Sequence, residues 1–467
     1  MDYLQKTGQA NPEAQLQAEK YVATGYQRLV TFEVPGGGFS LFGNPPAEVF
    51  LTAYGLMEFS DMAKVYPVDP ALIERTAQWL MNQQNSNGTW TEQGYSEHWN
   101  VTSQTATTAY IAWALIEAGY KSDPQVRRAI EYIREFARQE EDAYSLSLVA
   151  NALSAYDPDD STTKAVLQKL HDMRVKEDGD GAVYWQADMP SFMGATGESG
   201  SLETTALAAM AFMRGGDHPE AVQGALTYLV QGKDSWGTWQ TTQATILSLK
   251  AMLMAADTAG NAAEAATVRV SLNKEQSQEI NIDPTKGDVV HSIIFNQGFS
   301  RGGTNEIQLE VKGGENLMYQ VASSYYLPWD ALPVAPEAEE AVSIDLTYDR
   351  TELSVNDTVN VDVKIALKQG GVVKMALIDL GVPPGFTVLS EDLARLVEQS
   401  VISRYELTGR QIIIYLENLS SEQPVKFSYR LRARFPMRAQ TPPSSAYDYY
   451  NPTQQTIKAP LEMAVLE

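Results

Sequence analysis

The sequence predicts a multidomain chain, helical in its first half and built of antiparallel strands in its second: an α/α toroid followed by antiparallel β-sandwich domains. Three observations predict this. Near residue 260 the apolar spacing changes from three or four residues to simple alternation. Before that point, a unit of about 50 residues recurs. After it, a linker with Pro328, Pro333 and Pro336 and the acidic run 337–341 separates two sets of strands.

The composition is that of a folded, acidic protein without thiol chemistry. The 467 residues are 44% hydrophobic, and 59 Asp and Glu against 35 Lys and Arg give a formal charge of −24. That charge repels nucleic acid and anionic membranes, so neither is expected as a partner. The chain has no cysteine, which excludes disulfides, Cys-ligated zinc and a cysteine nucleophile within it. Residues 1–20 show no signal-peptide pattern.

Ten helices are predicted in the first half, because apolar residues recur there at helical spacing. Most are about 14–18 residues long with short connections, which is typical of antiparallel helical hairpins. The predicted helices span 13–30, 48–63, 70–84, 103–119, 124–138, 142–156, 161–174, 201–213, 218–231 and 241–256.

An internal repeat connects these helices, since a turn with an aromatic residue precedes each helix rich in Thr and Ala. A glycine allows the tight turn, the aromatic ring covers the end of a helix pair, and the small residues permit close packing. Five or six such hairpins suit a closed α/α ring with the Thr/Ala-rich helices inside, although an open solenoid satisfies the same pattern. The units pair Gly38-Phe39 with Leu51-Thr52-Ala53-Tyr54, Gly88-Thr89-Trp90 with Thr107-Thr108-Ala109-Tyr110, Trp185 with Glu203-Thr204-Thr205-Ala206, and Gly237-Thr238-Trp239 with Thr242-Gln243-Ala244-Thr245.

Two sets of strands are predicted after residue 260. The first set is short for a sandwich and leaves an open edge, which soluble proteins avoid, so we expect further strands from outside this chain. The second set predicts a β-sandwich with one inserted amphipathic helix from Ser390 to Gln399, with Ser390 as N-cap. The predicted strands are 266–272, 278–282, 289–295, 305–311 and 317–327 in the first set, and 342–348, 359–367, 375–383, 405–419 and 425–435 in the second.

His98 is the residue most suited to chemistry. It lies in a polar loop beside Glu97, eight residues after Trp90. Imidazole can act there as a general base or nucleophile near neutral pH, although most loop histidines are only solvated. No Ser-Asp pattern accompanies it, so a hydrolytic triad has no support. The four histidines do not pair at helical metal-ligand spacing, so no metal or cofactor site is expected.

The run 157–160 spells D-x-D-D, the proton-donor motif of the squalene-hopene cyclase class. That class also uses α/α rings and Q-x-x-x-G-x-W turns, and its motif faces a deep aromatic-lined cavity. Here Pro158 and the following Ser161 favour a turn that caps the next helix. A terpenoid-cyclase-like enzyme remains an alternative that requires Asp159 or Asp160 in a cavity.

Several longer stretches match one family in sequence and order. They are MDYLQKT, GYQRLVTF, LTAYGLMEF, QWLMNQQNSNGTW, TATTAYIAWAL and GTWQTTQATILSLKA, followed by IIIYLENL and AYDYYN in the final domain. Through them the chain resembles the C-terminal part of the α-macroglobulin and complement C3/C4 family. The resemblance implies a thioester-type α/α toroid domain over 1–258 that lacks the Cys-Gly-Glu-Gln segment, an incomplete CUB-like β segment over 259–335, and a receptor-binding-type macroglobulin β-sandwich over 342–467.

The resemblance implies a protease-trapping inhibitor of endopeptidases rather than a turnover enzyme. In that family, bait cleavage triggers a conformational change that exposes an internal Cys-Gln thioester, which captures a nucleophile on the attacking protease. In complement-type members a His eight residues after the turn aromatic attacks the thioester first, and His98 falls at that position. Aromatic residues of the last domain shield the thioester. Tyr415 and Tyr449 lie in the matching motifs, although tyrosines packed on strands are an equal interpretation.

The departures from the family define the remaining expectations. By comparison with the family, the Cys-Gly-Glu-Gln segment, the bait region and earlier macroglobulin domains are expected upstream of Met1. The expected partners are therefore proteases and the upstream region of the same protein; without a thioester the chain would be a non-covalent trap or interaction module. Ser390 and Ala394 stand where vertebrate members have two lysines, so no lipoprotein-type receptor is expected. The lack of cysteine indicates a bacterial-type relative, periplasmic or extracellular.

Overall fold

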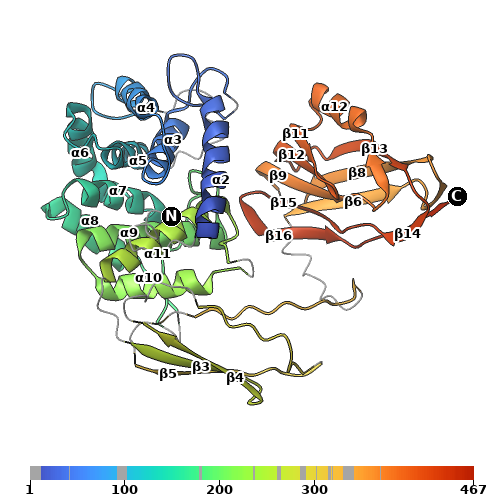
Figure 1. The fold of residues 1–467 in the computed structure, drawn as a ribbon. Helices are drawn as coiled ribbons and strands as arrows, with labels where there is room; N and C mark the ends of the chain where they lie inside the picture. The colour runs from blue at the N-terminus through green and yellow to red at the C-terminus, as the bar shows by residue number, and fades with distance from the viewer. Residues whose placement is uncertain are drawn as a thin grey trace.

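The structure is a computed structural model of the chain, and it has three parts in sequence order (Figure 1): a helical part, a small sheet and a larger β-sandwich. It describes residues 12–41, 43–91, 103–177, 181–234, 237–259, 265–283, 291–300, 302–313, 317, 319–329, 341–368 and 370–467.

All ten predicted helices are present, with small shifts at their ends. The first helical turn of the eighth, Gly-Glu-Ser-Gly, carries no apolar periodicity, so its start was predicted four residues late, at Ser201 instead of Gly197. The helices are α2 (Pro12–Leu29), α3 (Val49–Met62), α4 (Pro70–Asn82), α5 (Gln104–Glu117), α6 (Pro124–Phe136), α7 (Ala143–Tyr156), α8 (Ser161–Asp172), α9 (Gly197–Gly215), α10 (Pro219–Gln231) and α11 (Thr242–Ala259).

The helices form two layers, which confirms the predicted division into inner and outer helices. In α5, an inner helix, every residue from Thr105 to Leu115 is buried. In α6, an outer helix, only the stripe of Val126, Ala129, Ile130 and Ile133 is buried. Helices buried on all sides lie inside a core, whereas helices with one apolar stripe cover it. The helices α3, α5, α7 and α9 therefore line the centre, and α4, α6, α8 and α10 surround them.

The inner layer closes into a ring, so the open solenoid is excluded. The last helix, α11, returns to the first inner helix, α3. Lys250 Nζ of α11 lies 2.6 Å from Asp61 Oδ2 of α3. Phe50 and Tyr54 of α3 line the same small pocket as Ile246 of α11. The fold of this part is an α/α toroid.

Three of the repeat turns are fixed by a tryptophan that caps the end of an outer helix. Each indole N–H donates a hydrogen bond to a backbone carbonyl of the outer helix. The pairs are Trp90 to Leu80 O at 2.7 Å, Trp185 to Leu170 O at 2.6 Å and Trp239 to Leu229 O at 2.6 Å. Each acceptor lies among the last four carbonyls of its helix, which have no donor within the helix. All three tryptophans are fully buried. Each of these turns is therefore held to its outer helix by one buried indole and one hydrogen bond, and we call this arrangement a joint.

The threonines of the repeat complete these joints from the inner helices. The backbone N–H of the turn aromatic donates to a Thr hydroxyl, from Phe39 to Thr52 at 2.8 Å and from Trp239 to Thr245 at 3.0 Å. Glycine is required at Gly88, where φ is +87° and an added Cβ would lie 2.7 Å from a backbone oxygen of the neighbouring helix α6.

The small sheet has fewer strands than predicted. It contains β3 (Ala266–Leu272), β4 (Gln276–Ile282) and β5 (Ile307–Lys312), antiparallel, in the order β4-β3-β5. The strands predicted at 289–295 and 317–327 were wrong for the described residues of those ranges, which belong to no sheet. Alternating apolar residues favour an extended backbone, but a strand also requires a partner for its N–H and C=O groups.

The C-terminal part is the predicted β-sandwich. One sheet has the order β10-β13-β8-β6 and the other β11-β12-β9-β15-β16, and their facing side chains form a common core. A third, small sheet joins β14, β17 and β7. The strands are β6 (Val342–Tyr348), β7 (Glu352–Ser354), β8 (Thr358–Leu367), β9 (Val372–Gly381), β10 (Phe386–Val388), β11 (Arg404–Leu407), β12 (Gln411–Ser420), β13 (Val425–Ala433), β14 (Met437–Gln440), β15 (Ser444–Asp448), β16 (Asn451–Lys458) and β17 (Glu462–Leu466).

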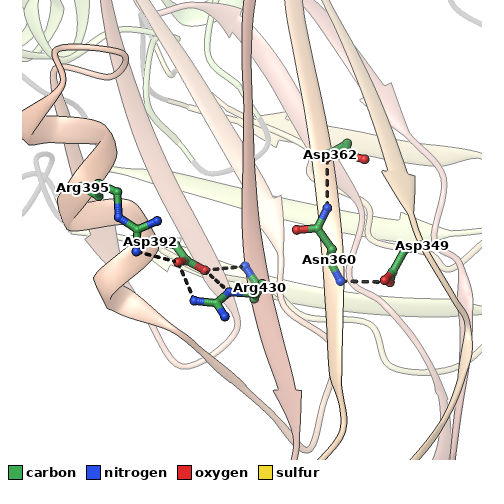
Figure 2. A network of polar contacts seen from close by, with 6 residues as sticks. All are labelled: Asp349, Asn360, Asp362, Asp392, Arg395 and Arg430. Carbon is green, nitrogen blue, oxygen red and sulfur yellow. Dashed lines mark hydrogen bonds and ion pairs between the residues drawn. The ribbon is translucent and has the colours of Figure 1, made fainter.

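The inserted helix, α12 (Ser390–Glu398), buries Leu393 in the sandwich core and is also joined to β13 by an ion pair (Figure 2). Asp392 accepts hydrogen bonds from Arg430 Nε at 2.8 Å, Nη2 at 2.9 Å and the backbone N at 3.1 Å. The prediction of Ser390 as N-cap was wrong: Leu389 is the N-cap and has no side-chain capping bond. The first-turn carboxylate of Asp392 faces β13 instead of its own helix.

A membrane-crossing helix would need a longer apolar run than any helix among the described residues contains.

Candidate functional site

One face of the five-stranded sheet carries a group of tyrosines, two of which, Tyr415 and Tyr449, were singled out from the sequence. Tyr415 on β12 and Tyr447 on β15 both lie opposite Leu377 of the intervening strand β9. Directly paired residues of antiparallel strands share a face. The core side chains Ala376 and Ile378 alternate with Leu377, so the tyrosines lie on the face turned away from the sandwich core.

The turn after β15 extends this face. The rings of Tyr449 and Tyr450 pack edge to face with centroids 5.2 Å apart, and 39% of Tyr449 is exposed. Asp448 holds the turn, because its carboxylate accepts from Tyr450 N at 3.0 Å and from Asn451 Nδ2 at 2.8 Å. Burial raises the pKa of Asp448 and raises that of Tyr450 to about 12. Tyr450 therefore carries a neutral hydroxyl group near neutral pH.

The tyrosine face is turned toward the ring. Asn451 Oδ1 accepts hydrogen bonds from the backbone N and from Oγ1 of Thr196, both at 3.0 Å. Thr196 is the N-cap of the inner helix α9. Burial raises the pKa of Tyr415, and the charge of Arg28, in the last turn of α2, opposes that rise. No sequence pattern predicts the Thr196–Asn451 contact, although Asn451 ends the AYDYYN stretch.

His98 lies outside the described residues, in the segment 92–102. The described residues on both sides of that segment are joined to each other. The Gln104 side-chain amide donates to the carbonyl of Trp90. Ser103 is the N-cap of α5, and its hydroxyl donates to Glu140 Oε1 at 2.7 Å. The described residues that flank positions 92–102 therefore meet at the start of an inner helix.

The start of α5 and the Thr196 contact lie at the same end of the ring. Inner and outer helices alternate along the chain as antiparallel hairpins, so all inner helices run in one direction. Ser103, the N-cap of α5, lies at the end where inner helices begin, and Asn451 contacts α9 at that same end. This end, with the tyrosine face and Asn451 against it, is the candidate functional site.

The D-x-D-D motif does not form a buried acid. Asp160 is the N-cap of α8 and accepts from Thr162 N at 2.8 Å. Asp157 caps the end of α7, and the side chain of Asp159 is 91% exposed. The capping interpretation is confirmed, and the cyclase-like alternative lacks the cavity acid that it requires.

A different carboxyl group is buried in the ring, and sequence analysis missed it. Glu203 on α9 is fully buried, and neither of its oxygens is aligned with a hydrogen-bond donor among the described residues. Burial raises its pKa to about 8, and the nearby Ser191 hydroxyl offsets this only in part. The pKa values of Tyr54 on α3 and Tyr144 on α7 are raised by burial and also by the charge of Glu203. Glu203 therefore lies among the inner helices. One acidic residue in the otherwise small and apolar run SLETTALAAMAF was the available signal.

The two positions considered for receptor binding lie on α12. Ser390 is its exposed first residue, and Ala394 is half-buried one turn later. The basic residue of the helix, Arg395, lies 3.4 Å from Asp392 through Nη2 and so belongs to the ion-pair network of Figure 2.

Two family models match the chain. One, described as the A-macroglobulin TED domain, matches residues 1–254, and one described as the A-macroglobulin receptor binding domain matches residues 371–459. Thioester-containing protein 1 allele S3 of Anopheles gambiae is 23% identical over 473 residues, which cover 98% of this chain and 33% of that protein. The chain thus spans about a third of the length of the curated relatives it matches.

Solved structures show the same fold. The crystal structure of native alpha-2-macroglobulin from Escherichia coli, from domain MG7 to the C-terminus, has a TM-score of 0.63 at 17% identity and covers 99% of this chain and 70% of its own. The structure of Salmonella alpha-2-macroglobulin reacted with methylamine has a TM-score of 0.63 at 17% identity, covering 99% of this chain and 28% of its own. These likenesses concern the fold: an α/α toroid followed by antiparallel β domains.

Proposed function

The chain belongs to the A-macroglobulin family, and from this premise we propose that it is the C-terminal region of a bacterial-type α-2-macroglobulin that traps proteases. Proteins of this family are protease inhibitors and not enzymes. The observation that carries the proposal is that both family domains occur in one chain and contact each other through Thr196 and Asn451 at the end of the ring where the inner helices begin.

The proposed mechanism is single-use covalent capture. Cleavage of an upstream bait segment moves the domains apart and exposes a Cys-Gln thioester that the upstream region contributes. An amine of the protease attacks the thioester carbonyl, a C–N bond forms, the C–S bond breaks, and the cysteine leaves as a thiolate. In the His98-assisted route, an imidazole nitrogen attacks the thioester carbonyl first, the C–S bond breaks, and the cysteine leaves as a thiolate. A hydroxyl oxygen then attacks the acyl-imidazole, the C–N bond breaks, imidazole leaves, and the hydroxyl proton passes to the thiolate, giving an ester and a thiol.

Tyr415 and Tyr449 are the proposed shields of the thioester. Two features support this: the tyrosine face is turned away from its own sandwich core, and Asn451 of the same turn contacts α9. Aromatic rings at this position would exclude water and small amines until the two domains separate. The Asn451–Thr196 contact is made by exposed groups, so it can break without a large cost in free energy.

The proposed setting is the periplasm or the extracellular space of a bacterium. The partners are target proteases and the upstream macroglobulin and thioester region of the same protein, which completes the CUB-like segment over 259–335. The net charge of −24 opposes binding to nucleic acid. Ser390 and Ala394, in place of two lysines, provide no basis for a lipoprotein-type receptor.

The test uses the protein extended to include its upstream region. After incubation with a protease, we expect a complex that survives denaturation, and methylamine treatment beforehand should abolish it. Replacing His98 with Ala should shift the covalent products from ester toward amide, whereas the matched variant His291→Ala should not.

Tyr415→Ala and Tyr449→Ala should speed the reaction with methylamine before any proteolysis, with Tyr405→Ala as the control.

The outcomes separate the candidate functions. A complex that forms but dissociates on denaturation would indicate a non-covalent trap. Failure to retain any protease would contradict the trapping proposal. Unchanged product ratios in His98→Ala would remove the role of His98 while leaving trapping intact.

A further inference from the structure

Two histidines far apart in the sequence meet on the outside of the ring. His171 lies in the last turn of α8, and His218 is the N-cap of α10. Their imidazole rings stack with centroids 3.9 Å apart and an interplanar angle of 12°. Phe212 at the end of α9 packs its ring edgewise against both. The ring fold therefore brings together two metal-binding side chains that have no sequence spacing typical of a metal site.

Glu220 adds a carboxylate to this pair. Its Oε1 lies 3.2 Å from His171 Nε2 and 3.7 Å from His218 Nδ1. The three potential ligand atoms all lie within 4.8 Å of one another. Tetrahedral coordination with bonds of about 2.0–2.1 Å places ligand atoms about 3.3 Å apart. The cluster is therefore close to the size of a metal coordination sphere.

The buried nitrogen of His171 is the second observation. Nε2 is buried and has no hydrogen-bond partner among the described residues, although Glu220 Oε1 is near, because that oxygen is not aligned with the ring nitrogen. A buried polar atom without a partner costs free energy. Glu220, by contrast, is 67% exposed, so solvent reaches the open side of the cluster.

We propose that His171 Nε2, His218 Nδ1 and the Glu220 carboxylate bind one divalent transition-metal ion, with Zn²⁺ as the best fit and water as the fourth ligand. Two imidazole nitrogens and one carboxylate oxygen suit Zn²⁺ and disfavour Ca²⁺ and Mg²⁺, which take oxygen ligands. This site is independent of the proposed trapping function.

Binding requires two local changes. A metal ion lies in the plane of each imidazole that binds it, so one of the two stacked rings must rotate away from the parallel arrangement. A His171 bound through Nε2 carries its proton on Nδ1, and Asp172 Oδ1, 3.6 Å away, is the acceptor for it. Arg174 Nη1, now 3.2 Å from Nδ1, must leave that nitrogen and keep its bond to the His171 carbonyl.

The ion would join two consecutive hairpins of the ring. His171 ends the outer helix of one hairpin, and His218 and Glu220 begin the outer helix of the next. Since binding occurs to the folded arrangement of these helices, the metal stabilises the ring against unfolding.

The test is a Zn²⁺ titration of the 467-residue chain after chelator treatment, followed by calorimetry. With no cysteine and four histidines, few competing sites exist. We expect one Zn²⁺ per chain, at least tenfold weaker binding in His218→Asn and Glu220→Gln, and stronger binding in Arg174→Gln. Asn tolerates the left-handed backbone of His218, whose φ is +52°, so this variant should fold. His291→Gln is the matched control and should bind as the parent does.

Two further readouts decide the assignment. Co²⁺ in place of Zn²⁺ should give a visible spectrum of nitrogen coordination that His218→Asn removes. Zn²⁺ should also raise the thermal midpoint of the parent chain but not of Glu220→Gln. No binding, or equal binding by the parent and His218→Asn, overturns the proposal.

Discussion

Two buried carboxyl groups, one in the ring and one in the sandwich, have opposite surroundings. Glu203 in the ring is fully buried without an aligned donor among the described residues, and burial raises its pKa to about 8. Asp392 in the sandwich is nearly as buried, but Arg430 donates three hydrogen bonds to it and lowers its pKa. Burial alone therefore does not decide whether an acid is charged; the donors around it do.

The difference gives the two parts opposite pH dependence. The folded pKa of Glu203 is raised, so its contribution to stability is complete below the unfolded pKa and is lost as pH rises through the folded one. The folded pKa of Asp392 is lowered, so its contribution is present above the unfolded pKa and is lost as pH falls through the folded one. A rise in pH from the unfolded pKa of a Glu side chain to about 8 should weaken the ring. Acid should weaken the attachment of α12.

Removing a joint of the ring should have the largest effect. Trp185→Ala removes the indole that caps α8 at the start of the repeat containing Glu203. The substitution leaves a buried cavity. We expect a loss of about 3–5 kcal/mol in the free energy of unfolding, measured by urea titration of the helical circular-dichroism signal. The control is Trp329→Ala, since Trp329 is 39% exposed and belongs to no joint. Equal losses in both variants would contradict the importance of the joint.

Glu203→Gln should abolish the weakening of the ring that a rise in pH toward 8 causes. Below the unfolded pKa the variant and the parent should have similar stability, because Glu203 is then neutral in both the folded and the unfolded state. Between the unfolded pKa, near 4.3, and about 8, the parent should lose stability steadily while the variant does not, a difference on the order of a few kcal/mol by pH 8.

The measurement is urea unfolding at a series of pH values. Glu131→Gln, an exposed position on α6, provides the control and should keep the slope of the parent. A Glu203→Gln variant with the same pH slope as the parent would show that Glu203 is not buried as a neutral acid.

Asp392→Asn should have the smallest effect of the three. It leaves Arg430 with a weaker partner, but the Arg430 side chain is 45% exposed, so water replaces part of the loss. We expect about 1–2 kcal/mol at neutral pH. The difference from the parent should shrink as the pH falls below the ordinary pKa of an Asp side chain, because the unfolded chain then takes up a proton that the folded Asp392, whose pKa is lowered, does not.

Glu391→Gln, at the exposed neighbouring position, should change little. Hydrogen exchange of α12 amides reports the attachment directly. A loss in Asp392→Asn that persists unchanged at pH 3 would mean that the pair contributes through packing and not through charge.

The helices and joints of the ring could be predicted because their signals are local. Apolar spacing marks each helix, and the Gly-x-Trp turns recur at similar positions. The closure of the ring could not be predicted, because it depends on Lys250 and Asp61, nearly two hundred residues apart, meeting across the gap. The tyrosines of the candidate site lie in recognisable motifs, but their orientation away from the sandwich core follows from strand register.

Alternation of apolar and polar residues gave a wrong strand prediction where no other signal supported it. Residues 317–327 alternate like a strand, yet the described ones among them pair with no neighbour, because alternation describes a backbone shape and a strand requires a second backbone. The prediction of Ser390 as N-cap failed as well, since the helix begins after Leu389. The partner of the first-turn acid Asp392 is Arg430, on a strand nearly forty residues later.

Local sequence thus determined the helices, the turn tryptophans and the order of the domains, since these depend on neighbours a few residues apart. Long-range packing determined the rest: the closed ring, the burial of Glu203, the meeting of His171 with His218, and the contact of Asn451 with Thr196. The physical reason is that the charge of an acid, the ligands of a metal and the partner of a strand are set by groups brought near in space, and a sequence pattern does not contain their distances.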